Sequence, residues 1–331
     1  MNGLKPKIYI TRKIPNQILE IIKEACEVTM WKEAETPVPR EELERQIRGV
    51  DGLYCLLTEQ IDQELLEKAP NLKIVSNMAV GYNNIDVDAA TEKGIMVTNT
   101  PGVLTETTAD LTFALLMSTA RRIVESDQFL RKGNWKTWSP MLLTGQDIYG
   151  ATLGIIGLGR IGEAVARRAA GFKMNVLYHN RSRKVEAEQE LGITFTDMES
   201  LLKESDYVCV LTPYTQETKN LIGQKGLSLM KETAILINTS RGGIVNEDAL
   251  YSALKNGEIW AVGLDVFEEE PVSMDHPLLS LPNVVALPHI GSASKNTRLK
   301  MAEVAAVNLL AGLQNQTPPH LVNTITVRNQ R

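Results

Sequence analysis

The sequence predicts an α/β protein that consists of two doubly wound parallel-sheet domains. The chain has 331 residues, which is long enough for two domains. Short apolar runs alternate with amphipathic helical patterns, and this alternation is typical of parallel sheets with helices on both faces. A glycine-rich turn near the middle of the chain opens a second series of the same kind.

The first series occupies the N-terminal third of the chain. Its apolar runs are short enough for strands, and the segments between them have helical periodicity. The predicted strands are residues 7–11, 26–31, 51–57, 72–79 and 95–98. The predicted helices are residues 16–25, 40–48, 62–68 and 86–93.

The second series begins with an apolar strand, the turn Gly157-Leu-Gly-Arg-Ile-Gly162 and a helical run over residues 163–170. In this G-x-G-x-x-G pattern the first glycine permits a tight turn, the second lets the backbone approach a pyrophosphate, and the third lets the helix lie close to the strand. The helix N-terminus offers free N–H groups to phosphates. We therefore predict that a dinucleotide binds to Gly157, Leu158, Gly159, Arg160, Ile161 and Gly162. The strands expected in this series are residues 152–156, 175–178, 207–211, 234–238, 261–265 and 284–286.

The domain boundaries are expected close to residues 100 and 290. Asn99-Thr-Pro-Gly102 suits a hinge before a helical run at residues 106–122. The last predicted helix, residues 293–313, has no strand after it in the second series, so we expect it to return to the first domain. The predicted division is residues 1–100 plus 291–331 for a substrate-binding domain and residues 101–290 for a dinucleotide-binding domain.

Composition argues against several other classes of function. The net charge is −5, with acidic and basic residues interleaved, so neither a nucleic-acid surface nor a polybasic membrane patch is expected. Apolar runs are too short to cross a bilayer, and the N-terminus lacks a signal-peptide pattern. The three cysteines are widely spaced without a C-x-x-C motif, which indicates reduced core thiols, no metal site and a cytoplasmic protein.

A nicotinamide enzyme that reduces a carbonyl needs a proton donor, and histidine is the usual choice. The chain has four histidines. His320 lies in a Pro-rich tail, His276 lies in a loop, and His179 ends the second strand of the dinucleotide-binding domain. His289 directly follows a strand, at the end where α/β sheets bind ligands. His289 is therefore the candidate proton donor, although an ordinary loop histidine would fit the same pattern.

Two charged residues could act with His289. Arg241 follows an apolar strand and precedes two glycines, so its guanidinium could bind a carboxylate through two parallel hydrogen bonds. Glu270 ends an acidic run after the strand at residues 261–265, and a carboxylate bound to an imidazole orients the ring and favours its charged form. The alternatives are a solvated loop arginine and a solvated acidic face. Because all three residues follow strand C-termini in one domain, they make a stronger candidate site together than singly.

The residues after the second strand of this domain indicate which dinucleotide is bound. NAD sites usually place an acidic residue about twenty positions beyond the glycines to hold the ribose 2′-hydroxyl. Asn180 stands there instead, and Arg181, Ser182 and Arg183 follow it. These side chains could receive a 2′-phosphate, although a solvated basic loop is the alternative. We predict NADP(H) as the preferred cofactor, with NAD(H) possible.

Five further segments resemble the D-isomer-specific 2-hydroxyacid dehydrogenase family, and the resemblance covers nearly the whole chain. The segments are Val80-Gly-Tyr-Asn-Asn-Ile-Asp86, Asn99-Thr-Pro-Gly102, Asn238-Thr-Ser-Arg-Gly-Gly-Ile-Val-Asn-Glu-Asp-Ala-Leu250, Gly263-Leu-Asp-Val-Phe-Glu-Glu-Glu-Pro271 and Pro288-His-Ile-Gly-Ser292. Asn83 stands where many relatives carry Asp, which we expect to leave the chemistry unchanged. The resemblance implies a flavodoxin-like substrate domain and a Rossmann nucleotide domain. It also implies a homodimer through the nucleotide domain, with the apolar helix at residues 108–120 as an expected contact.

The resemblance implies a role for each candidate residue. Arg241 would bind the substrate carboxylate and polarise the carbonyl. Glu270 would hold and tune His289, which would donate the proton. Val80 and Gly81 would lend backbone N–H groups to the substrate carboxylate. The remaining expected cofactor contacts are Thr212, Pro213, Thr239, Ser240 and Asp265.

Two features bear on the substrate. Leu56 and Leu57 fall where phosphoglycerate-using relatives place an arginine, so an unphosphorylated substrate is expected. The segment Trp135-Lys-Thr-Trp-Ser-Pro140 resembles the glyoxylate and hydroxypyruvate reductases, in which such a tryptophan reaches a neighbouring subunit's active site. Ordinary interface packing is the alternative for Trp138. The expected function is NADPH-dependent reduction of glyoxylate or hydroxypyruvate to the D-2-hydroxy acid.

Two other functions stay open at this point. A reductase of 2-ketogluconate would share the same motifs, with a cleft of different depth. A nucleotide-sensing corepressor-like binding protein would also share the nucleotide fold and the three candidate catalytic residues. The chain lacks a basic or disordered extension, which argues against the second alternative.

Overall fold

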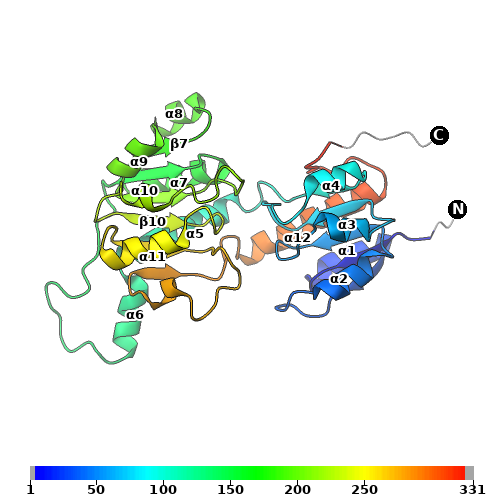
Figure 1. Ribbon diagram of the computed structural model, residues 1–331, viewed down its shortest axis with the longest axis horizontal. Helices are drawn as coiled ribbons and strands as arrows, with labels where there is room; N and C mark the ends of the chain where they lie inside the picture. Colours follow the sequence, from blue (N-terminus) through cyan, green and yellow to red (C-terminus); the bar gives the residue numbers. More distant parts are fainter. Residues whose placement is uncertain (1–3, 325–331) are drawn as a thin grey trace. The chain divides into compact units, whose positions relative to one another are not determined.

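The computed structural model describes residues 4–324, and these residues form two compact units. Unit 1 runs from the N-terminus to Leu104 and resumes at Ser294, whereas unit 2 comprises Thr105–Ala293. Each unit is a sheet with helices packed against it (Figure 1). The boundaries fall three or four residues beyond those expected from the sequence. The assignment of substrate binding to one unit and dinucleotide binding to the other stays a prediction.

Unit 1 contains a five-stranded parallel sheet in the order β2-β1-β3-β4-β5. Its strands are β1 (Lys7–Ile10), β2 (Glu27–Met30), β3 (Gly52–Cys55), β4 (Ile74–Asn77) and β5 (Met96–Thr98). Its helices are α1 (Asn16–Ala25), α2 (Arg40–Ile47), α3 (Gln63–Glu67), α4 (Val87–Glu92) and α12 (Lys295–Leu313). This order is that of flavodoxin-like folds, and its switch point lies between β1 and β3.

Helix α12 joins the C-terminal part of the chain to the sheet of unit 1. It packs against α1 and against β3, β4 and β5. Small residues allow the close approach: a Cβ at Gly312 would lie 2.5 Å from Cδ1 of Ile74. Two buried hydroxyls of the sheet donate hydrogen bonds to carbonyls of the helix, Tyr54 to Ala302 at 3.2 Å and Ser76 to Ala305 at 2.7 Å.

Unit 2 contains a seven-stranded parallel sheet in the order β12-β11-β10-β9-β6-β7-β8. Its strands are β6 (Thr152–Ile156), β7 (Asn175–His179), β8 (Thr194–Phe195), β9 (Tyr207–Val210), β10 (Ile235–Asn238), β11 (Ala261–Leu264) and β12 (Val284–Ala286). Its helices are α5 (Thr105–Ala120), α6 (Ile123–Arg131), α7 (Arg160–Ala170), α8 (Val185–Leu191), α9 (Met198–Glu204), α10 (Gln224–Leu227), α11 (Glu247–Asn256) and the 3₁₀ helix η1 (Pro277–Ser280). The order reverses between β6 and β9, as in Rossmann folds. The predicted fold class, two doubly wound parallel-sheet units, is confirmed.

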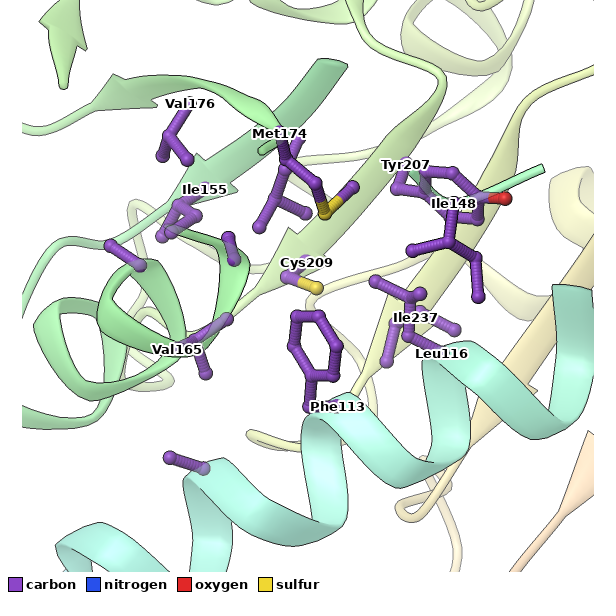
Figure 2. Packing of buried hydrophobic residues seen from close by; sticks show 14 of the residues in the cluster. Phe113, Leu116, Ile148, Ile155, Val165, Met174, Val176, Tyr207, Cys209 and Ile237 are labelled. Carbon is purple, nitrogen blue, oxygen red and sulfur yellow. The ribbon is translucent and has the colours of Figure 1, made fainter. Parts of the chain in front are cut away.

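The core on one face of this sheet forms where α5 and α7 cover it. Figure 2 shows the ring of Phe113, from α5, pointing toward Cys209 of β9, with Val165 and Ile237 on either side. Burial raises the pKa of the Cys209 thiol to about 12, so it stays protonated and unreactive at neutral pH. All three cysteines are free and buried.

Three details differ from the sequence prediction. Strand β3 ends at Cys55, so Leu56 and Leu57 lie after the strand and not within it. The helix expected over residues 106–122 ends at Ala120, because Arg122 has a left-handed backbone (φ 51°) and is the N-cap of α6. The two-residue strand β8 was not predicted, because so short a run has no detectable period. Within residues 4–324, no helix combines the length and apolar character needed to cross a membrane.

Candidate active site

The glycine turn after β6 has the geometry that a phosphate-binding turn requires. Gly157 has φ 98°, and a Cβ there would lie 2.6 Å from the backbone nitrogen of Thr212, after β9. A Cβ at Gly162 would lie 2.6 Å from the carbonyl oxygen of Gly157. A Cβ at Gly159 would meet no atom within 4 Å. The first and third glycines are therefore needed for packing, whereas the space beside the second is open for a pyrophosphate.

The N-terminus of α7 is also open to a phosphate. Gly159 is the N-cap of this helix, and no side chain caps it. The turn is held from the side by Asn180, whose Oδ1 accepts the N–H of Leu158 at 2.7 Å and whose Nδ2 donates to the Leu158 carbonyl at 3.3 Å. Asn180 therefore fixes the turn with both ends of its carboxamide. Its expected contact with the ribose would have to compete with these two bonds, and it stays a prediction.

The basic residues after β7 differ in their partners. The guanidinium of Arg183 donates to both carboxylate oxygens of Glu188 at 2.6–3.0 Å, and Tyr178 donates its hydroxyl to the same carboxylate at 2.7 Å. These bonds, that of Arg183 above all, lower the pKa of Glu188 to about 2. Arg181 and Ser182 are exposed, and Arg181 has no hydrogen-bond or ion-pair partner in the part of the chain that the structure describes. Arg181 is therefore the basic side chain with its hydrogen-bonding groups available.

The loops after β9 and β10 are tied together by predicted cofactor residues. The hydroxyl of Ser240 donates to the carbonyl of Thr212, and the hydroxyl of Thr239 shares a 2.7 Å hydrogen bond with that of Thr112. The Pro213 carbonyl accepts the hydroxyl of Thr218 at 2.8 Å. These contacts fix the two loops at the carboxyl edge of the sheet. Direct contacts of these residues with a dinucleotide stay predictions.

Asp265, at the end of β11, holds the turn that follows His289. Its two carboxylate oxygens accept the N–H groups of Ile290 and Gly291, each at 2.7 Å, and the residue is 1% exposed. Burial raises the pKa of Asp265, although the two amide donors act in the opposite direction. Both oxygens are thus committed to the backbone beside His289. The expected cofactor contact of Asp265 is not tested by this geometry.

His289 and Glu270 form a close pair. Nδ1 of His289 lies 2.7 Å from Oε2 of Glu270, and Oε1 of Glu270 accepts the N–H of Phe267 at 3.0 Å. Burial raises the pKa of Glu270, but the hydrogen bond and charge of His289 outweigh it, so the pKa lies below its ordinary value. His289 has a left-handed backbone, with φ 53°. Its Nε2 has no hydrogen-bond partner within residues 4–324, so this atom is available for a ligand.

Arg241 lies in the loop after β10, in the same unit. Nη1 donates to the carbonyl of Ser240 at 2.8 Å, and Nδ2 of Asn238 donates to the carbonyl of Arg241 at 2.9 Å. Burial lowers the pKa of Arg241, while the charge of Glu270 raises it. An arginine stays protonated under these conditions. The arrangement offers a fixed cation and a carboxylate-bound imidazole at strand C-termini of one sheet.

Two of the other three histidines have hydrogen-bond partners for a ring nitrogen. Nδ1 of His179 lies 3.0 Å from the carbonyl of Thr196, and Nε2 of His276 lies 3.0 Å from Oε2 of Glu247. His320 belongs to unit 1. These surroundings leave His289 as the candidate proton donor. The pairing of His276 with a carboxylate was not expected from the sequence.

In unit 1, the expected substrate residues follow β3 and β4. The N–H of Leu56 donates to the buried carboxylate of Glu59 at 2.8 Å, which fixes the turn that carries Leu56 and Leu57. The carbonyls of Val80 and Gly81 accept hydrogen bonds from asparagine side chains. Their N–H groups have no acceptor among the described residues, so both can bind an anion. Glu59 was not predicted as a site residue, and its only signal in the sequence was a carboxylate four residues beyond the end of β3.

The exposed apolar side chains of unit 2 concentrate on α6 and the loop after it. Trp135, Trp138 and Met141 are 56–76% exposed, and the segment extends away from the sheet (Figure 1). Most residues of the expected dimer helix, 108–120, are buried against α7, β10 and β11 of its own unit. The expected contact of this helix with a second chain stays a prediction. No cluster of possible metal ligands occurs among residues 4–324.

The Rossmann strand order and the open glycine turn place the protein in the class of dinucleotide-binding α/β proteins. A histidine–carboxylate pair at the same sheet edge fits an oxidoreductase of that class. Residues 113–291 match the family model of the D-isomer specific 2-hydroxyacid dehydrogenase NAD binding domain. The chain belongs to this family, and it is an oxidoreductase that uses a nicotinamide cofactor.

Individual relatives cover almost the whole chain. The glyoxylate reductase of Korarchaeum cryptofilum is 53% identical over 326 residues, 98% of each chain. The glyoxylate reductase of Thermococcus litoralis is 52% identical over 97% of each chain. A crystal structure of an NADPH-dependent glyoxylate/hydroxypyruvate reductase from Sinorhizobium meliloti, in complex with NADP and malonate, matches with a TM-score of 0.83 and 36% identity. That match covers 96% of this chain and 97% of the other.

Proposed function

We propose that the protein reduces a small 2-oxo acid, glyoxylate or hydroxypyruvate, to the D-2-hydroxy acid with NADPH. The observation that carries the proposal is the 2.7 Å contact between His289 Nδ1 and Glu270, which leaves Nε2 of the imidazole available. The names of the relatives, glyoxylate reductase and glyoxylate/hydroxypyruvate reductase, support this choice of substrate.

The chain's own residues supply the acid–base and electrostatic parts of the reaction. Arg241 binds the substrate carboxylate and stabilises the negative charge that develops on the carbonyl oxygen. Nε2 of His289 gives its proton to that oxygen as the carbonyl is reduced. Glu270 holds the ring through Nδ1 and stabilises its protonated form before the transfer.

The dinucleotide is held by the glycine turn and by the loops after β7, β9 and β10. The open side of Gly159 and the uncapped N-terminus of α7 suit the pyrophosphate. When bound, the nicotinamide supplies the hydride that adds to the carbonyl carbon. NADPH is preferred because residues 180–184, directly after β7, include no acidic side chain and because Arg181 is available to a 2′-phosphate. The NADP bound to the Sinorhizobium meliloti reductase supports this preference.

The substrate contacts of unit 1 fit a small acid without a phosphate. The N–H groups of Val80 and Gly81 bind the substrate carboxylate, and Leu56 and Leu57 supply an apolar wall. We also propose that the protein is a homodimer, with α6 and its loop at the interface. Trp138, which is 75% exposed in the single chain, then contacts the second copy.

The test measures oxidation of NADPH and NADH with glyoxylate, hydroxypyruvate and 2-ketogluconate in parallel. Fast turnover of the two small acids with NADPH is the expected result. A dominant rate with 2-ketogluconate would keep the mechanism and replace the substrate by a sugar acid. No turnover with any of the three would refute the proposed reaction, and it would favour a nucleotide-sensing corepressor-like binding protein.

A further inference from the structure

The loop that carries Glu270 is in direct backbone contact with the loop that carries Arg241. A Cβ at Gly242 would lie 1.9 Å from both the carbonyl carbon and the carbonyl oxygen of Phe267, and 2.2 Å from the nitrogen of Glu268. These distances are far below any real contact, so only a glycine permits this spacing. The Phe267–Glu268 peptide therefore lies directly against the Arg241 loop.

Two carboxylates bind the N–H groups of this segment. Glu270 accepts the N–H of Phe267 at 3.0 Å, and Oε1 of Glu247 accepts the N–H of Glu268 at 2.7 Å. The other oxygen of Glu247 lies 3.0 Å from Nε2 of His276. The His276 ring in turn packs edge-on against the ring of Phe267, with 5.9 Å between centroids. Glu247 and His276 thus contact the same segment that Gly242 approaches.

The N-cap of helix α11 does not involve the side chain of Glu247. Asn246 already caps the helix, because its side chain accepts the N–H of Ala249 at 2.8 Å. Asp248 places a second negative charge in the first turn, where it interacts favourably with the helix dipole. The Glu247 side chain is only 15% exposed and is turned toward the Glu270 loop. A role outside the helix follows from this arrangement.

We propose that Glu247 is a positioning residue for the Glu270–His289 pair. Its carboxylate fixes the Phe267–Glu268 peptide against Gly242, and the peptide fixes Glu270 through the Phe267 N–H. The position of the Glu270 carboxylate then depends on Glu247 and on the close approach of Gly242 to the Phe267–Glu268 peptide. The consequence for catalysis rests on the proposed function, in which His289 is the proton donor. The expected change in the geometry of His289 is independent of the proposed function.

Three variants test the proposal. E247A removes the acceptor of the Glu268 N–H, whereas E247Q keeps a carboxamide oxygen in the same place. D248N is the matched control, because it removes the same charge from the same helical turn. Its side chain is exposed and has no partner among the described residues. For each variant we would measure kcat and KM for glyoxylate, the Kd of NADPH, and the imidazole ¹⁵N shifts of the cofactor-free protein. With four histidines in the chain, the His289 signals can be assigned from single substitutions.

We expect E247A to lower kcat roughly 10- to 100-fold, because a displacement near 1 Å has a cost of that order. The Kd of NADPH should stay within about twofold, and the Nδ1 shift of His289 should move as its bond to Glu270 weakens. E247Q should regain most of kcat, and D248N should match the unchanged protein.

A His289 shift that is the same in E247A and D248N would overturn the proposal, whatever the rates. If E247A does not fold, the His289 shift is compared between E247Q and His276→Ala. His276→Ala removes the imidazole that contacts the Glu247 carboxylate, so the His289 shift should move in this variant and not in E247Q. A moved His289 shift with an unchanged kcat would support the positioning role and refute His289 as proton donor.

Discussion

Replacing Arg181 with alanine should weaken the binding of NADPH and leave the binding of NADH nearly unchanged. Arg181 is exposed after β7, and its guanidinium makes no hydrogen bond or ion pair within the described part of the chain, although its charge helps to lower the pKa of Glu217. A hydrogen bond between charged groups contributes about 1.5–3 kcal/mol, and exposure places this one near the lower end. The loss of about 1.5–2 kcal/mol corresponds to a roughly 10- to 30-fold weaker binding of NADPH. NADH has no 2′-phosphate, so its Kd should hardly change.

Arg183 provides the matched comparison, since it lies two residues further along the same loop. Its guanidinium already donates to both oxygens of Glu188, at 2.6–3.0 Å, so a phosphate would have to compete with this carboxylate. R183A should therefore weaken NADPH by less than about threefold, within the range of surface ion pairs. The measurement is the Kd of both cofactors by fluorescence titration at a fixed salt concentration. Salt must be fixed because screening changes such interactions.

Two results would refute the reasoning. Equal losses of NADPH and NADH affinity in R181A would show that Arg181 acts on the loop and not on the phosphate. A larger loss of NADPH in R183A than in R181A would move the phosphate contact to Arg183. The ion pair with Glu188 would then have to open when the cofactor binds.

Changes at the glycine turn, at the candidate reacting residues and at Glu270 test separate parts of the geometry. G162A should destabilise the protein by about 1–3 kcal/mol, because its Cβ would lie 2.6 Å from the Gly157 carbonyl. G159A, whose Cβ meets open space, should leave the melting temperature nearly unchanged but weaken NADPH; equal melting shifts in the two variants would contradict this. H289A should lower kcat by roughly 10²- to 10⁴-fold while the Kd of NADPH holds, and R241A should raise KM and lower kcat for 2-oxo acids. If H289A instead lost affinity for NADPH, the assignment of His289 as a proton donor without a role in cofactor binding would be wrong. Because the pKa of Glu270 is lowered by folding, its contribution to stability is complete above its ordinary value of 4.5 and is lost as pH falls through the lowered value. The melting-temperature difference between the unchanged protein and E270Q should therefore narrow below about pH 4.5, and a difference independent of pH would argue against the pairing.

The sequence predicted those parts of the molecule that depend on periodicity and on chain order. Alternating strands and helices determine a parallel sheet, and residues that follow such strands gather at one edge, as Arg241 and His289 do. The direction of a loop side chain depends on backbone angles that carry no period. The sequence therefore did not show that the side chains of Asn180 and Asp265 accept neighbouring N–H groups, and their expected contacts with the cofactor stay predictions. His276 was set aside as a loop residue, because its partner Glu247 lies 29 positions away in the sequence.

At three places around the candidate site, a side-chain oxygen accepts the backbone N–H groups of a loop. Asn180 accepts the N–H of the glycine turn, Asp265 accepts two N–H groups after His289, and Glu247 accepts one beside Glu270. Loops at strand ends have N–H groups that no neighbouring strand satisfies, and buried donors of this kind need an acceptor. Two of the three acceptors are ionisable carboxylates, which make stronger hydrogen bonds to N–H groups than neutral oxygens do. Because reacting groups must be held to within about 0.5 Å, these acceptors should affect turnover without touching a ligand. The loops of this protein can thus hold the candidate reacting groups because side chains behind them replace the missing hydrogen bonds of the sheet.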